Sequence, residues 1–102
     1  MASVYEIVEK ARKTGKIEKG TNEVTKAVER GTAKLVVVAK DIEPKEIVQH
    51  LPIICKEKEI YFYEVDNKKK LGIASGLNVG CASIAVIELG DADKDFESLI
   101  KK

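Results

Sequence analysis

The clearest candidate site in the sequence lies between two glycines, in residues 20–31. When the apolar residues of this segment turn inward on a helix, Glu23, Lys26 and Arg30 share the opposite face, and Asn22 lies beside them at the helix start. The amide both donates and accepts, the carboxylate accepts, and the cations and free N–H groups of the helix start can bind phosphate. Ordinary helix chemistry also explains each residue: Asn as a cap, Glu as a partner of the helix dipole, Lys and Arg as a solvated face. Spacing alone slightly favours this second interpretation.

Two later segments offer complementary chemistry. Lys68, Lys69 and Lys70 form a cationic run that begins a helix, close to where an α/β sheet exposes its strand ends. Such a run is usually a solvated turn, but beside the Asn22 face it would make a cationic rim around a small base-reading centre. In residues 76–80, two apolar side chains lie in a glycine-flanked loop. These side chains either pack into the core at the start of a strand or offer an apolar surface to an unstacked nucleotide.

The sequence lacks the residue patterns of common enzymes. Its seven glycines are scattered rather than grouped in a phosphate-binding loop. The single histidine, His50, has no nucleophile to serve, and a histidine partly packed under a helix is far more common than a lone catalytic base. Cys55 and Cys81 have no partner at metal-ligand spacing, so we expect two buried thiols. The residues alone therefore give only weak support for an enzyme, and they indicate neither a cofactor nor a metal ion.

Length and composition indicate one small domain. The chain has 102 residues, 44% of them hydrophobic, so we expect residues 1–102 to form a single domain around one core. Eighteen basic residues against seventeen acidic ones give a net charge of +1, so any nucleic-acid site must be a local patch. No apolar run reaches the ~20 residues of a membrane helix. We expect a cytoplasmic protein that does not enter a membrane and is a monomer when free.

Hydrophobic periodicity predicts alternating helices and strands. Helices are predicted at residues 4–12 and 22–30, from Pro44 onward, and at residues 71–75 and 93–101; strands are predicted at residues 16–19, 35–39, 60–65 and 82–87. We expect Thr21 or Asn22 to cap the second helix, and Pro52 to kink or end the third near Gln49. The order predicts an α/β fold: a three-layer α/β/α sandwich with a central mixed four-stranded sheet.

Several segments, taken in order, resemble the L7Ae family of archaeal ribosomal proteins. They are residues 19–26 with Arg30 and Gly31, residues 43–48 with residues 50–55, and residues 70–72. The relatives of this family include a small eukaryotic spliceosomal and nucleolar protein and ribosomal protein L30e. The similarity covers nearly the whole chain. It therefore favours a binding face on the helix of residues 22–30 over the interpretation of these residues as an ordinary cap and solvated face.

The resemblance implies a non-catalytic protein that binds kink-turn RNA, a sharply bent internal loop with tandem sheared G·A pairs. It implies ribosomal RNA of the large subunit, box C/D and H/ACA guide RNA and RNase P RNA as partners, with other ribonucleoprotein proteins assembling on the complex. The implied RNA-binding residues are Lys19, Gly20, Thr21, Asn22, Glu23, Lys26, Arg30, Glu43, Lys68, Leu77, Asn78, Val79 and Ala82. Asn78 stands where archaeal members often carry Glu, and a neutral amide there would change which kink-turn or kink-loop variants are accepted.

The residues alone leave two other classes of function open. A protein-interaction module would dock through residues 93–101 or residues 50–54. A small ligand-binding enzyme domain would use the polar turn at residues 66–68, near the expected strand ends.

Overall fold

Helices and strands alternate along the parts of the chain that the computed structural model describes, residues 4–41 and 49–100. The elements are α1 (Val4–Thr14), β1 (Lys16–Lys19), α2 (Thr21–Glu29), β2 (Leu35–Ala39), α3 (His50–Glu57), β3 (Tyr61–Val65), α4 (Lys68–Ala74), β4 (Ser83–Glu88), a short 3-10 helix η2 (Gly90–Ala92) and α5 (Asp93–Ile100). None of the helices in these two ranges has the length and apolar character needed to span a membrane.

The four strands form one mixed sheet in the order β1-β4-β2-β3. Strand β2 pairs in parallel with β3, and β4 runs antiparallel to both β1 and β2. The carboxyl ends of β1, β2 and β3 therefore meet the amino end of β4 at one edge of the sheet, at Lys19, Ala39, Val65 and Ser83. We call this the carboxyl edge.

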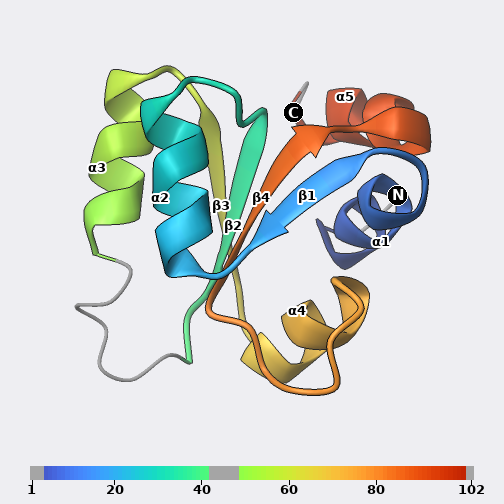
Figure 1. The fold of residues 1–102 in the computed structure, drawn as a ribbon. Coiled ribbons are helices and arrows are strands. Elements are labelled where there is room, and N and C mark those ends of the chain that lie inside the picture. Colours follow the sequence, from blue (N-terminus) through green and yellow to red (C-terminus); the bar gives the residue numbers. More distant parts are fainter. Residues whose placement is uncertain (1–3, 42–48, 101–102) are drawn as a thin grey trace.

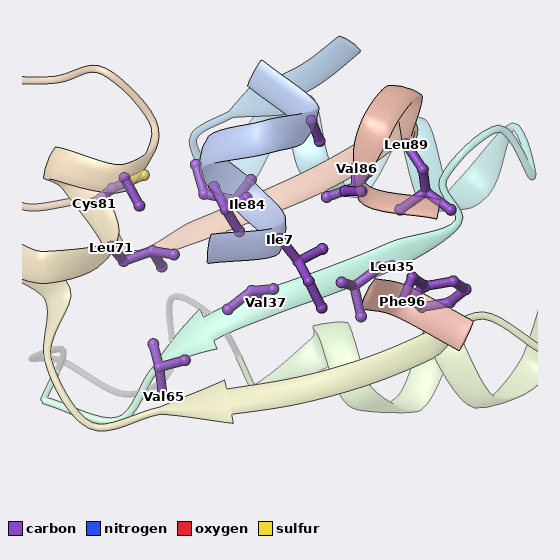
Figure 2. Close-up of a cluster of buried hydrophobic side chains, with 14 of the residues drawn as sticks. Ile7, Leu35, Val37, Val65, Leu71, Cys81, Ile84, Val86, Leu89 and Phe96 are labelled. Atoms are coloured by element: carbon purple, nitrogen blue, oxygen red, sulfur yellow. The ribbon is translucent and has the colours of Figure 1, made fainter. Parts of the chain in front are cut away.

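Helices cover both faces of the sheet (Figure 1): α2 and α3 lie on one face, and α1, α4 and α5 lie on the other. Alternate residues of β2 enter the two cores, because Leu35 and Val37 pack with α1 whereas Val36 and Val38 pack with α2. Figure 2 shows Ile7 of α1 lying over Leu35 and Val37. This arrangement confirms the predicted three-layer α/β/α sandwich and its mixed four-stranded sheet.

Both cysteines are buried and free, as predicted. Cys55 lies in the core between α3 and the sheet. Burial raises the pKa of its thiol to about 11, so the group stays protonated at neutral pH. The thiol therefore packs as a small apolar side chain rather than as a nucleophile or a metal ligand.

The prediction that a side chain caps α2 is wrong. The N-cap residue is Gly20, and within the described residues the helix has no side-chain cap hydrogen bond at this end. Helix α2 begins at Thr21, so the two predicted caps lie inside its first turn, past the position from which a side chain can cap. The helix ends as predicted before Gly31, whose positive φ of 72° allows the N–H of Thr32 to reach the carbonyl of Ala27 at 3.0 Å.

Helix α3 begins where an end or a kink was predicted. Its first residue is His50, and Pro52 stands in its first turn, where a missing N–H needs no partner within the helix. The part of this prediction that concerns a helix starting at Pro44 falls on residues 42–48, outside the described residues.

The loop of residues 76–82 is held against α4 by two glycines. Gly76 has a φ of 87° and ends the helix, so that the N–H of Leu77 bonds the carbonyl of Gly72 at 2.8 Å. Gly72 also lies so close to the carbonyl oxygen of Val79 that a Cβ atom at this position would collide with it. The 76–82 loop thus rests directly on the backbone of α4.

Replacing Gly72 by alanine should therefore push the 76–82 loop off α4. We expect Gly72→Ala to lower the free energy of unfolding by about 1–3 kcal/mol, measured by urea denaturation, because a methyl group is forced into filled space. Gly80→Ala is the matched control in the same loop, since a Cβ there would lie 3.1 Å from the flexible side chain of Lys68, which can move. Equal losses of stability in the two variants would contradict the close approach.

Candidate nucleic-acid interface

The turn between β1 and α2 is fixed to the carboxyl edge by the start of β4. The N–H of Gly20 donates to the carbonyl of Ser83 at 3.1 Å, and the hydroxyl oxygens of Thr21 and Ser83 lie 3.3 Å apart. Gly20 has a φ of 92°, a conformation that costs glycine little. Lys19 is exposed at the end of β1. The first turn of α2 therefore has a fixed position at this edge of the sheet.

The exposed face of α2 carries the predicted base-reading side chains. Asn22, Glu23 and Lys26 are all exposed, while the apolar residues between them are buried. Lys26 Nζ lies 3.8 Å from Glu23 Oε1, and both side chains are more than half exposed. A pair of this kind contributes little to stability, so both groups are available to a ligand. Arg30 follows at the C-cap, exposed and without an ion pair to any described residue.

A hydrogen bond to α3 fixes the orientation of α2. The Thr25 hydroxyl donates its one hydrogen to the Thr21 carbonyl at 2.7 Å, and its oxygen lies 2.8 Å from His50 Nε2. Because that hydrogen is already used, Nε2 must carry a proton and act as the donor. His50 is also half-buried. The hydrogen bond and the burial together agree with the interpretation of His50 as a packed histidine rather than a catalytic base.

Lys68 is the junction of three segments at the carboxyl edge. Its N–H donates to Asp41 Oδ1 at 2.8 Å, and its carbonyl accepts from the N–H of Cys81 at 3.0 Å. Asp41 follows β2, Lys68 begins α4, and Cys81 belongs to the 76–82 loop. Sequence reasoning did not select Asp41, since an exposed aspartate after a strand carries no signal of its own.

The lysine run at the start of α4 has polar supports of its own. Asn67 caps the helix by accepting from the N–H of Lys70 at 3.0 Å. The Tyr5 hydroxyl donates to Asp66 Oδ1 at 2.7 Å, and this hydrogen bond lowers the pKa of the Asp66 carboxyl. The hydrogen bond also ties α1 to this end of the sheet.

The 76–82 loop is anchored at both ends and exposed in the middle. Leu77 is partly buried against the core, and the Ala82 carbonyl accepts from the N–H of Ala39 at 3.0 Å. Asn78 and Val79 between them are exposed, and 66% of Val79 is open to solvent. The anchoring leaves one polar and one apolar side chain on the surface of the loop.

The structure thus brings most of the predicted site residues to one end of the molecule. Bonded contacts connect the turn at residues 19–21 through β4 to the 76–82 loop and to Lys68. Asn22 and Glu23 lie in the first turn of α2, and Lys26 and Arg30 extend along that helix. Glu43 lies outside the described residues. The described parts of the chain contain no cluster of three or more His, Cys, Asp or Glu residues that could hold a metal ion.

Comparison with known proteins identifies the family. Residues 2–96 match the model of the ribosomal protein L7Ae/L30e/S12e/Gadd45 family. A solved structure described as the Giardia lamblia 15.5kD RNA binding protein is similar over 96% of this chain and 84% of its own, with 30% sequence identity and a TM-score of 0.86. These matches confirm the prediction that the chain is not an enzyme. The chain belongs to the ribosomal protein L7Ae/L30e/S12e/Gadd45 family.

Proposed function

We propose that this chain binds RNA and that it recognises and stabilises kink-turn RNA. One observation carries the proposal: the exposed Asn22, Glu23 and Lys26 lie on a helix whose start is bonded to the same sheet edge as Lys68 and the 76–82 loop. The family and the RNA-binding protein of similar structure support RNA as the class of ligand.

The side chains of α2 suit the exposed base edges of a kinked RNA. In a sheared G·A pair the Watson–Crick edge of the guanine is free, so Glu23 accepts from its N–H groups. Asn22 and Lys26 face acceptor atoms such as O6. In a regular A-form helix the Watson–Crick edge is occupied by base pairing, and O6 faces a groove too narrow for side chains, so we propose a preference for the kinked site.

Cations around this centre supply the contacts to phosphate. We assign Lys19, Arg30 and Lys68 to the RNA backbone, because all three are exposed. Contacts of this type fix the position of the protein on the RNA without reading its sequence. We assign Leu77, Asn78 and Val79 to the flipped-out nucleotide, with Leu77 chiefly anchoring the loop and the two exposed residues making the contact.

We further propose the cellular setting. The RNA targets are ribosomal RNA of the large subunit, box C/D and H/ACA guide RNA and RNase P RNA, on which other ribonucleoprotein proteins assemble. The free protein is a cytoplasmic monomer.

The primary test is a gel-shift titration at fixed salt concentration. It compares a kink-turn RNA with the same RNA in which Watson–Crick pairs replace both sheared G·A pairs. Tight binding to the first RNA alone supports kink-turn recognition. Equal, weak and salt-sensitive binding to both RNAs would mean that the Asn22 to Arg30 face is only a solvated helix, and the proposal would be wrong.

Removing the proposed guanine acceptor should weaken binding without unfolding the protein. We expect Glu23→Ala to weaken kink-turn binding by about 1–3 kcal/mol, because guanine N–H groups lose their partner. The melting temperature should change little, since the side chain is exposed. Glu97→Ala is the control, because Glu97 is an exposed carboxylate of α5 on the opposite face of the sheet. Unchanged affinity in a folded Glu23→Ala protein would exclude the base-reading role.

Asp41 should support binding through its hydrogen bond rather than its charge. We expect Asp41→Ala to weaken kink-turn binding by about 0.5–1.5 kcal/mol, because Lys68 loses the acceptor that fixes its backbone. Asp41→Asn retains an oxygen acceptor and removes a negative charge near the RNA, so its affinity should equal or exceed that of the wild type. The measurement is the same titration, and equal weakening in both variants would show that the charge itself is what matters.

A further inference from the structure

A hollow of about 170 Å³, lined by both charged and apolar residues, lies between α2 and the edge strand β1. It begins beside Glu23 and Lys26, the residues assigned above to base reading, and continues along α2 to Arg30. Its other wall is formed by Lys16 and Glu18 of β1. The hollow is therefore continuous with the proposed RNA face but extends away from the carboxyl edge.

The geometry of β1 explains why charged side chains line this wall. Ile17 packs into the core beneath α1, so its neighbours Lys16 and Glu18 lie on the opposite face of the strand, towards α2. Between Lys16 and Ile17 the pairing with β4 shifts, so that Ile87 has no partner on β1. Ile87 and the largely buried Ala27 make the floor of the hollow apolar.

The charges around the hollow are only loosely neutralised. Lys16 Nζ lies 4.0 Å from Glu18 Oε1, and Lys26 Nζ lies 3.8 Å from Glu23 Oε1. Both pairs are at the long end of ion-pair distances, and both lysines are more than half exposed. Arg30 has no ion pair within the described parts of the chain. Three cations against two carboxylates leave the hollow with an excess of positive charge.

We propose that this hollow is a second RNA subsite that seats a ribose-phosphate segment of the stem adjoining the kink. The inference rests on the proposed function, since the strand enters from the bases bound by Asn22, Glu23 and Lys26. The apolar floor accepts the sugar, and Lys16 and Arg30 bind the phosphate at the rim. Lys16 is thus a phosphate-binding residue outside the set assigned above. Glu18 beside it opposes the RNA backbone and limits the affinity of the subsite.

The test compares charge variants on kink-turn RNAs whose two stems are shortened separately. On the full RNA we expect Lys16→Ala to weaken binding roughly two- to fivefold, the range of an exposed ion pair. The slope of log affinity against log salt should fall by roughly 0.7–0.9, as for one lost phosphate contact. Glu18→Gln should instead tighten binding. Lys13→Ala is the control, because Lys13 is an equally exposed lysine of α1 that pairs with Glu9 at 3.1 Å.

Shortening one of the two stems should abolish the effect of Lys16→Ala, whereas shortening the other should leave it intact. The subsite is wrong if Lys16→Ala behaves like Lys13→Ala on every RNA, or if Glu18→Gln weakens binding. It is also wrong if neither truncation changes the effect of Lys16→Ala. The wild-type protein shows whether the subsite alone or the proposed function is wrong. If only the subsite is wrong, the wild-type protein still prefers the kink-turn RNA to the Watson–Crick-paired RNA. If the proposed function is wrong, this preference is absent.

Discussion

The burial of β2 on both faces is the constraint on which the rest of the structure depends. Its five residues are apolar and buried, so each face of the sheet needs its own helical layer. Each fully buried valine or leucine contributes about 1.5–3 kcal/mol relative to exposure, and exposing one face would lose several such contributions. With helices on both faces, a ligand can reach the sheet itself only along its edges, while the exposed helix faces remain open. The parallel pairing of β2 with β3 then directs both carboxyl ends to the edge where the candidate site lies.

The candidate site is held by backbone hydrogen bonds more than by side-chain interactions. Gly20 bonds to Ser83, Ala39 to Ala82, and Cys81 to Lys68, and each bond joins segments that are distant in the sequence. The exposed side chains contribute little to stability, since the ion pair between Lys26 and Glu23 is long and solvated. This division lets the surface bind a ligand while the scaffold beneath it stays fixed, which reduces the ordering cost of binding.

The sequence predicted those features that follow from hydrophobic pattern. The unbroken apolar run at residues 35–39 predicted the central strand, and the apolar spacing within α2 predicted which of its faces is exposed. Features that depend on a shift of one or two residues were not predictable. The start of α2 at Thr21 removed the expected side-chain cap, and the start of α3 at His50 changed Pro52 from a breaker into a first-turn residue. The hollow beside β1 needs the register shift at Ile87, and the role of Asp41 needs Lys68 brought to it from 27 residues away. No local sequence pattern predicts the register shift at Ile87 or the hydrogen bond between Asp41 and Lys68.

The near-neutral charge of the chain fits a ligand that is read by shape and base edges rather than held by charge alone. A net charge of +1 gives little long-range attraction to a polyanion, so under the proposed function affinity comes from short-range contacts that the kinked RNA geometry satisfies. Carboxylates at such a surface repel the phosphates of a regular duplex, and no hydrogen bond offsets this repulsion. Glu23 is the main example. The same carboxylates are offset where an RNA presents unpaired guanine N–H groups. Selectivity in this protein is therefore expected to arise as much from what its acidic residues reject as from what its lysines attract.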